Sequence, residues 1–177
     1  VQHQHLEVVF ELFNLLQRSV PSLDGISLNN VLSASAELGY LEIVKQVHAY
    51  TFKVGLVNDT MLSNGLIDTY AKCGSLDDAA KHFEMMGTNC DVFSWSSLIV
   101  GYAQSGYARK ALDLFARMRN LGIRPNHVTF VGVLTACSRV GFVDEGCYYY
   151  SIMEPEHGIL PTREHCSCVI DLLARAG

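Results

Sequence analysis

Five glycines recur at a nearly constant interval along this 177-residue chain; each follows an apolar segment of helical periodicity, and the first four also precede one. The intervals between them are 35, 32, 35 and 36 residues. Such a period is typical of a solenoid, in which each unit is too small to bury its apolar face alone and stacks on its neighbours. The sequence therefore predicts a row of repeats. The five glycines are Gly39, Gly74, Gly106, Gly141 and Gly177.

The repeats become visible when the chain is aligned on these glycines. The segment before each glycine has apolar residues at its fourth, seventh, eighth and eleventh positions, as in Trp95, Leu98, Ile99 and Tyr102, which is the stripe of an amphipathic helix. A second helical segment follows each of the first four glycines, and a short turn ends the unit. This pattern predicts an all-α fold, a right-handed α-solenoid of helix-turn-helix repeats. The predicted units are residues 1–24 (partial), 25–59, 60–91, 92–126, 127–162 and 163–177 (partial).

Composition limits the classes of function. With 49% hydrophobic and 18% charged residues, the chain has the composition of a folded protein. Its apolar runs are too short to span a bilayer, so no membrane partner is expected. The net charge of -5 argues against a protein that holds nucleic acid mainly by the phosphates. The six cysteines lie mostly at apolar helix positions and are expected to be reduced, structural thiols.

Three segments resemble the pentatricopeptide repeats of plant proteins: residues 64–74 (NGLIDTYAKCG), 94–99 (SWSSLI) and 125–134 (PNHVTFVGVL). The resemblance covers essentially the whole chain. The alternating lengths resemble the mixed subclass of that family, with long-type repeats at 25–59 and 127–162, a short one at 60–91 and a standard one at 92–126. Residues 163–177 resemble the last short repeat before a C-terminal extension. The chain is thus expected to be a section from the C-terminal part of a longer repeat tract.

The resemblance implies sequence-specific binding of single-stranded RNA in chloroplasts or mitochondria, most often to direct cytidine-to-uridine editing, with accessory editing proteins as further partners. In that family one nucleotide is read per repeat, by the fifth residue and the last residue. The family's code implies uridine for an asparagine with an aspartate, and adenine for a serine with an asparagine. The implied pairs are Asn29 with Asp59, Asn64 with Asp91, Ser96 with Asn126 and Val131 with Thr162, and Ser167 is the fifth residue of the last partial repeat.

Two further columns are implied to face the RNA. The second residues of the repeats are expected to flank the bases: Ile26, Met61, Phe93 and Val128, with Glu164 departing from the apolar pattern. The residues two positions before each turn glycine include three cations, Lys72, Arg139 and Arg175, which can form a phosphate track on an acidic protein. Each of these sets of residues also has a purely structural interpretation. In it the pairs are helix caps, the second residues are apolar contacts between units, and the cations lie on a solvated helix face.

Motifs for catalysis are lacking in the sequence. It has no phosphate-binding glycine loop and no nucleophile elbow. His5 and Glu7 have the His-x-Glu spacing of a zinc deaminase, but the sequence has no Cys-x-x-Cys to complete the metal site. We expect no enzymatic activity, no cofactor, no metal site and no small-molecule substrate. The alternative function is a protein-binding scaffold of the tetratricopeptide kind, although those repeats keep a fixed spacing of about 34 residues.

Overall fold

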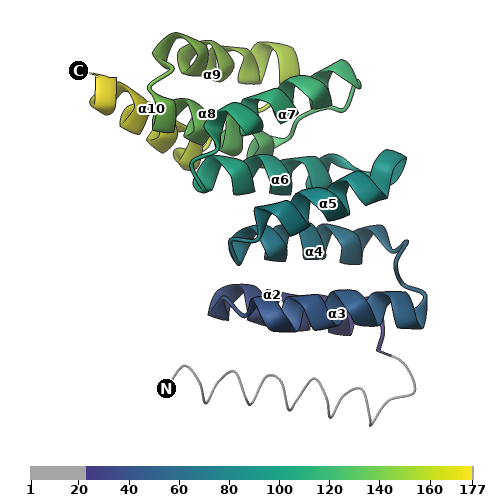
Figure 1. The fold of residues 1–177 in the computed structure, drawn as a ribbon. Helices are drawn as coiled ribbons and strands as arrows, with labels where there is room; N and C mark the ends of the chain where they lie inside the picture. Colours follow the sequence, from purple (N-terminus) through teal and green to yellow (C-terminus); the bar gives the residue numbers. More distant parts are fainter. Residues whose placement is uncertain (1–22, 177) are drawn as a thin grey trace. The chain divides into compact units, whose positions relative to one another are not determined.

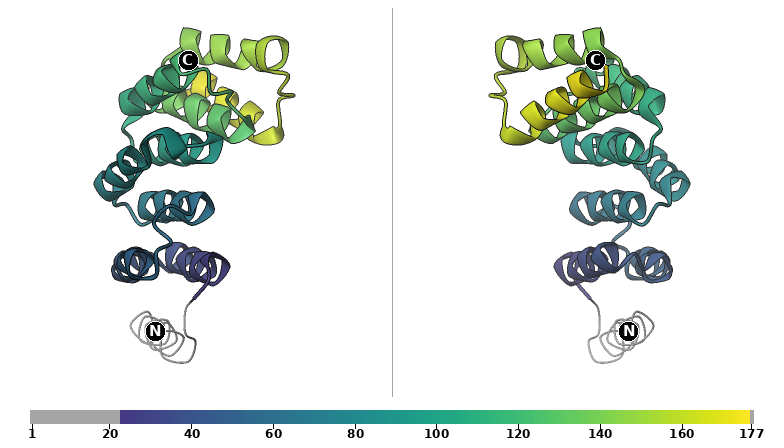
Figure 2. Two further views of the ribbon diagram at one scale, coloured as in Figure 1. Left: turned by 90° about the vertical axis from the view of Figure 1, so that its right-hand side faces the viewer. Right: turned by 90° about the vertical axis from the view of Figure 1, so that its left-hand side faces the viewer.

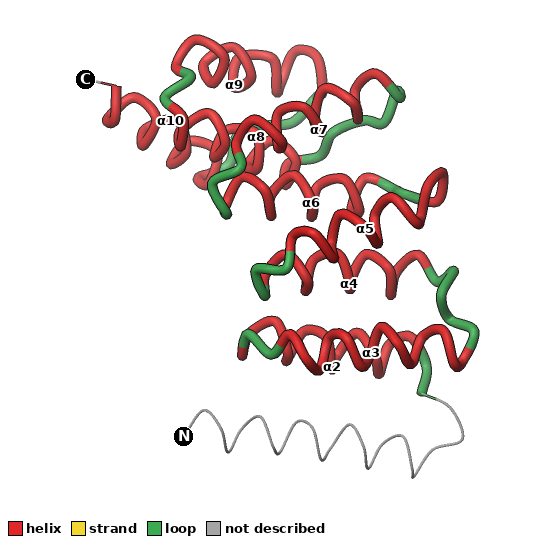
Figure 3. The backbone as a smooth tube through the Cα atoms, in the orientation of Figure 1, coloured by secondary structure: helices red, strands yellow, loops and turns green. Residues whose placement is uncertain are grey.

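The computed structural model describes residues 23–176, and this part of the chain consists of α-helices and short loops, with no strand (Figures 1 and 3). The predicted all-α fold of helical hairpins is confirmed. The partial repeat at 1–24 lies almost wholly outside the described residues, as does Gly177. The helices are α2 (Gly25–Leu38), α3 (Leu41–Val54), α4 (Thr60–Lys72), α5 (Leu76–Met86), α6 (Val92–Gln104), α7 (Ala108–Asn120), α8 (His127–Val140), α9 (Val143–His157) and α10 (Arg163–Ala176), with a short 3-10 turn at Gly87–Asn89.

The helices alternate between two kinds along the chain. Helices α2, α4, α6, α8 and α10, called the first helices below, each begin at the first residue of a sequence repeat. Helices α3, α5, α7 and α9, the second helices, each follow one of the turn glycines. Among the described residues no helix is both long and apolar enough to cross a membrane.

The backbone conformation of the turns explains why glycine occupies them. Gly39 and Gly141 have φ angles of 70° and 72°, in the left-handed region that other residues rarely adopt. After Gly39 the chain turns back, and the Tyr40 amide donates a 2.9 Å hydrogen bond to the Ser35 carbonyl. This turn ends the first helix and starts the second. The glycine interval in the sequence is therefore the interval between helix-to-helix turns.

The chain divides into two compact units, one up to Gly87 and one from Thr88, and each is described by itself. In the first unit α2 packs against both α3 and α4, and α4 packs against α5 (Figure 2). The core there includes Leu28, Leu32 and Ile67, all at most 1% exposed. In the second unit α8 contacts α6, α7, α9 and α10. Stacking of equivalent first helices thus buries the apolar stripes in each unit.

A pair of histidines, one of them buried, lies where α3, α4 and α5 meet. His48 forms a 3.0 Å hydrogen bond with the Tyr70 hydroxyl through Nδ1, and its ring centroid lies 4.6 Å from that of His82. His82 is 2% exposed, and neither of its ring nitrogens has a hydrogen-bond partner among the described residues. Burial, with repulsion from His48 as a smaller cause, lowers the pKa of His82 to about 4. The ring is therefore neutral at neutral pH.

Candidate nucleic-acid interface

The last residue of three predicted repeats caps the first helix of the next repeat. Asp59 precedes α4, and its Oδ1 accepts a 2.8 Å hydrogen bond from the Leu62 amide. Asp91 and Asn126 precede α6 and α8 in the same way, each within a reciprocal capping box. The interpretation of these residues as caps is therefore correct. Capping occupies one side-chain oxygen and leaves the second polar atom of the side chain for other contacts.

The structure brings the predicted pair Ser96 and Asn126 into direct contact. The Ser96 hydroxyl lies 3.3 Å from Asn126 Oδ1 and 2.7 Å from Thr129 Oγ1, and it also donates to the Val92 carbonyl. Asn126 Oδ1 accepts a 2.9 Å hydrogen bond from the Thr129 amide. Because only the carbonyl oxygen of an amide accepts hydrogen bonds, this cap fixes which way the Asn126 side chain is turned. Its Nδ2 donor makes no hydrogen bond with the described residues.

Burial of Ser96 differs from the expected direct contact with a base. Ser96 is only 2% exposed, because two residues lie over its hydroxyl: Asn126, the last residue of its own repeat, and Thr129, from the next repeat. Ser167 is the equivalent residue of α10 and makes the same bond to the carbonyl four residues before it, Arg163, at 2.9 Å. Ser167 is exposed, since no further repeat covers it among the described residues. The fifth position is thus accessible or buried according to the repeat that follows.

Asn29 and Asp59 each lie against a glycine. A Cβ built on Gly65 would lie 2.1 Å from Asn29 Oδ1, and one on Gly25 would lie 3.2 Å from Asp59 Oδ2. Asn29 therefore lies beside α4, and Asp59 lies beside the first residue of α2.

Of the other two predicted pairs, Asn64 with Asp91 is divided between the two compact units and Val131 with Thr162 lies within the second. Asn64 belongs to the first compact unit and Asp91 to the second, so each is placed only within its own unit. Val131 is half-buried and Thr162 is exposed. The Thr162 hydroxyl lies 2.8 Å from His165 Nδ1, and His165 Nε2 donates a 2.8 Å hydrogen bond to the His127 carbonyl. Nδ1 of this buried ring thus bonds the residue that precedes α10, and Nε2 joins α10 to α8.

The predicted base-flanking residues form a column of exposed apolar side chains. Each is the second residue of its helix, where it projects into solvent instead of the core. Glu164, at the same place in α10, is also exposed. Single exposed apolar residues are common, but one at the same position of two successive first helices in each compact unit indicates a contact surface on that unit. Their exposed fractions are 62% for Ile26, 58% for Met61, 61% for Phe93 and 37% for Val128.

Two of the three predicted phosphate-track cations are paired with a carboxylate one helical turn before them. Lys72 Nζ lies 2.7 Å from Asp68, and Arg175 Nε lies 3.0 Å from Asp171. Hydrogen bonds from Ser138 and Arg175 lower the pKa of Asp171 below its usual value. Arg139 is exposed and forms no ion pair with the described residues. The spacing of four residues between each acid and base is the sequence signal that predicts these pairs.

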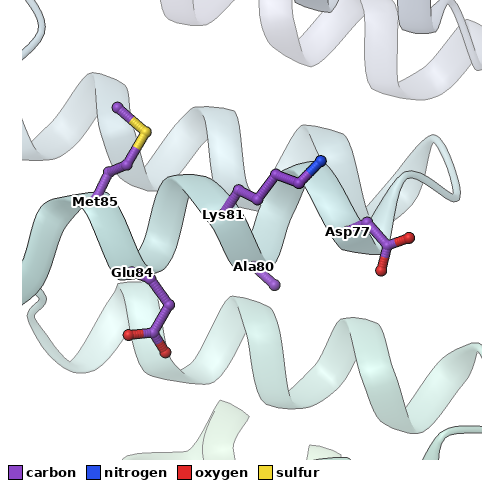
Figure 4. A pocket seen from close by; sticks show the side chains of 5 residues that line it. All are labelled: Asp77, Ala80, Lys81, Glu84 and Met85. Atoms are coloured by element: carbon purple, nitrogen blue, oxygen red, sulfur yellow. The ribbon is translucent and has the colours of Figure 1, made fainter.

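A shallow pocket on α5 is separate from these columns. It is lined by Asp77, Ala80, Lys81, Glu84 and Met85, which project from successive turns of this second helix (Figure 4). No predicted site residue lines it, and its charged side chains are of both signs. The first helices, rather than this pocket, therefore carry the candidate site.

The comparison with family models now decides what these repeats are. A model of the PPR repeat family matches residues 90–139, and a PPR repeat model matches residues 62–90. Residues 62–139 of this chain belong to the PPR repeat family. A mitochondrial pentatricopeptide repeat-containing protein of Arabidopsis thaliana is 54% identical over 177 residues, which are 100% of this chain and 23% of that protein. A chloroplastic one from the same plant is 38% identical over 173 residues, 98% of this chain and 20% of that protein.

Solved PPR structures share the fold. The PPR protein PPR10, in complex with an 18-nt psaJ RNA element, has a TM-score of 0.79 at 24% identity, over 93% of this chain and 24% of that one. A second structure of PPR10, from maize, has a TM-score of 0.65 at 22% identity, over 96% of this chain and 26% of that one. This PPR chain spans about a quarter of the length of the proteins it matches. The predicted location, mitochondrion or chloroplast, is that of the named relatives.

Proposed function

We propose that this PPR chain binds single-stranded RNA in a sequence-specific way, with one base read per repeat. The observation that carries the proposal is the cap geometry. In repeats 25–59 and 92–126 the last residue commits one oxygen to the next helix and keeps a second polar atom for a base. That atom is Nδ2 in Asn126 and Oδ2 in Asp59, and neither makes a hydrogen bond with the described residues. The RNA complex of PPR10, which has the same fold, supports single-stranded RNA as the ligand.

The uncommitted atoms match particular base edges. The Asn126 Nδ2 donor suits the N1 acceptor of adenine, and the Asp59 Oδ2 acceptor suits the N3 hydrogen of uracil. Ser96 with Asn126 is then the adenine reader, in which the buried Ser96 hydroxyl contacts Asn126 Oδ1 and holds the Asn126 side chain in place. Asn29 with Asp59 and Asn64 with Asp91 are the uridine readers. Val131 with Thr162 is assigned no base, and Ser167 belongs to the next reading position.

The exposed apolar column supplies contacts to the base faces. A base stacked on an aromatic side chain contributes roughly 1–3 kcal/mol, so Phe93 is the strongest candidate in this column. Ile26, Met61 and Val128 offer smaller apolar surfaces at the equivalent places. Contacts to phosphates from Lys72, Arg139 and Arg175 are modest, because the net charge of -5 opposes the RNA backbone. Base contacts therefore provide most of the discrimination.

We further propose that the protein from which these repeats come specifies sites of cytidine-to-uridine editing, or of other transcript processing, in a mitochondrion or chloroplast. The alternation of repeat lengths supports the mixed long and short subclass and a place late in the repeat tract. Accessory editing proteins would contact the long-type repeats at 25–59 and 127–162. In this scheme the repeats bind RNA and carry out no chemical step.

Selection of bound RNAs from a randomised single-stranded pool tests the proposal with the 177-residue chain. The expected product is enrichment of uridine, uridine and adenine at three adjacent positions, read by repeats 25–59, 60–91 and 92–126. Duplex RNA of the same sequence should bind more weakly. Asn126→Ala is the matched control, and it should remove only the adenine preference. A pool without a motif, or equal binding to duplex, would contradict base reading and would favour the protein-binding alternative.

A further inference from the structure

Gly65 lies in the interior of α4, where glycine is an unfavourable choice. Its φ angle is not among the positive values found at the turn glycines, so the helical backbone does not require it. Glycine in the middle of a helix destabilises the helix relative to alanine. The reason for glycine at this place must therefore lie in what surrounds it.

The surroundings of Gly65 identify one neighbour that excludes a larger residue. A Cβ at position 65 would lie 2.1 Å from Asn29 Oδ1 and 3.2 Å from Asn29 Cγ, with Leu32 Cδ1 next at 3.5 Å. A separation of 2.1 Å is far inside van der Waals contact, so alanine and the present Asn29 side chain cannot both be accommodated. The three nearest atoms all belong to side chains. Gly65 thus makes room for the Asn29 amide.

Gly132, at the same place in repeat 127–162, has a different neighbourhood. A Cβ there would lie 3.0 Å from Ile99 Cγ2 and 3.0 Å from Val100 Cγ2, with the Val100 backbone nitrogen at 3.2 Å. This glycine allows two helices to approach closely, and the reading residue Ser96 is not among its nearest contacts. Of these two equivalent glycines, only Gly65 therefore lies against a reading residue.

We propose that Gly65 is a positioning residue for base selection by repeat 25–59. By leaving space beside α4, it permits the rotamer that Asn29 adopts, and it thereby decides how strongly this repeat selects uridine. The inference rests on the proposed RNA-binding function. It assigns part of the specificity of one repeat to a residue of the next repeat that is neither its fifth nor its last.

Gly65→Ala tests this assignment because alanine favours the helix and disturbs Asn29. The melting temperature is expected to stay the same or rise, since the contact is with the mobile end of a side chain. Preference for uridine at the nucleotide of repeat 25–59 should fall about tenfold, while preference for adenine at repeat 92–126 stays unchanged. Gly132→Ala is the matched control. It should lower the melting temperature and leave the uridine preference intact.

Nuclear magnetic resonance of the side-chain amide of Asn29 gives a readout without RNA. Its signals should move in Gly65→Ala and stay in place in Gly132→Ala. If Gly65→Ala melts at lower temperature, adding Asn29→Ser should restore the loss, because the shorter side chain relieves the contact. Unchanged Asn29 signals and an unchanged uridine preference would overturn the role of Gly65 while leaving RNA reading intact. Failure of the unmodified chain to discriminate bases would instead overturn the proposed function, and the role in base selection with it.

Discussion

The Ser96 hydroxyl and the Asn126 carboxamide oxygen lie 3.3 Å apart, although 30 residues separate them in the chain. This contact joins the start of α6 to the cap of α8, so the proposed reading position of one repeat is held against the first helix of the next. Thr129 completes it, with its own hydroxyl 2.7 Å from that of Ser96. A base at this position would therefore meet a side chain whose orientation is set by the fold before RNA arrives, which lowers the cost of ordering on binding.

Asn126→Asp should convert the adenine reader into one that favours guanine. The carboxylate keeps an oxygen for the cap of α8, but the atom left for the base changes from a donor to an acceptor, which suits the N1 and N2 hydrogens of guanine. Adenine should lose and guanine gain about 1–3 kcal/mol at that nucleotide alone. Competition binding with RNAs that differ at this base measures the change. Equal weakening for all sequences would show that Asn126 serves only as a cap.

Thr129→Val should destabilise the second unit through lost hydrogen bonds. Thr129 is fully buried, and its hydroxyl accepts a 3.0 Å hydrogen bond from the backbone amide of Asn126. The same hydroxyl also contacts that of Ser96. Valine has nearly the same shape but leaves these polar groups unpaired, at a cost of about 1–3 kcal/mol in the free energy of unfolding.

Urea denaturation with Thr129→Ser as the control separates this effect from packing. Serine keeps the hydroxyl and loses one methyl group, which costs about 0.8 kcal/mol. The serine variant should therefore be the more stable of the two. The reverse order would mean that the methyl contacts of Thr129 matter more than its hydrogen bonds.

His82→Phe should make the first unit less sensitive to acid. The pKa of His82 is about 4 in the folded chain and near 6.5 when unfolded, so between these values the unfolded state binds the proton more tightly. The stabilisation from the neutral ring is fully present above pH 6.5 and is lost as pH falls towards 4. The loss amounts to as much as about 3 kcal/mol. Phenylalanine keeps an aromatic ring beside His48 and has no proton to bind.

Free energies of unfolding of both proteins between pH 7 and pH 4 provide the measurement. Carboxylates titrate alike in the two chains, so the difference curve isolates position 82. The variant should gain stability relative to the unmodified chain as pH falls. A flat difference curve would show that His82 is hydrated in the folded state.

The fold could be predicted from the sequence because its main signals are local. Gly39 and Gly141 mark turns that need a left-handed residue, and such turns are decided by a few neighbouring residues. Asp59 and Asn126 at the repeat ends are local cap signals as well. The sequence was thus sufficient to place the starts of the first helices and the polar residues next to them.

Features that depend on contacts between repeats were not predicted. Burial of Ser96 requires Thr129 from the next repeat, and the His48 and His82 rings meet only after α3 and α5 have packed. The role proposed for Gly65 likewise depends on Asn29 of the preceding repeat. None of these relationships follows from the order of residues alone, because each depends on how closely helices of neighbouring repeats pack.

Asp68→Asn should strengthen RNA binding by releasing Lys72 from its ion pair. The two side chains lie 2.7 Å apart and are 57% and 42% exposed for Lys72 and Asp68, so the pair is on the surface and breaking it costs at most about 1 kcal/mol of stability. The freed ammonium can then contact a phosphate. Each added phosphate contact steepens the plot of log affinity against log salt by about 0.7 for a single strand.

Glu42→Gln is the control for Asp68→Asn, since it makes the same change in net charge and frees Lys45 from a 3.5 Å pair on the second helix α3. Titration of a single-stranded RNA at several salt concentrations compares the two. Asp68→Asn should raise affinity and steepen the salt dependence, whereas Glu42→Gln should do neither if the RNA lies along the first helices. An equal response in both variants would mean that total charge, and not the column containing Lys72, governs contact with the phosphates.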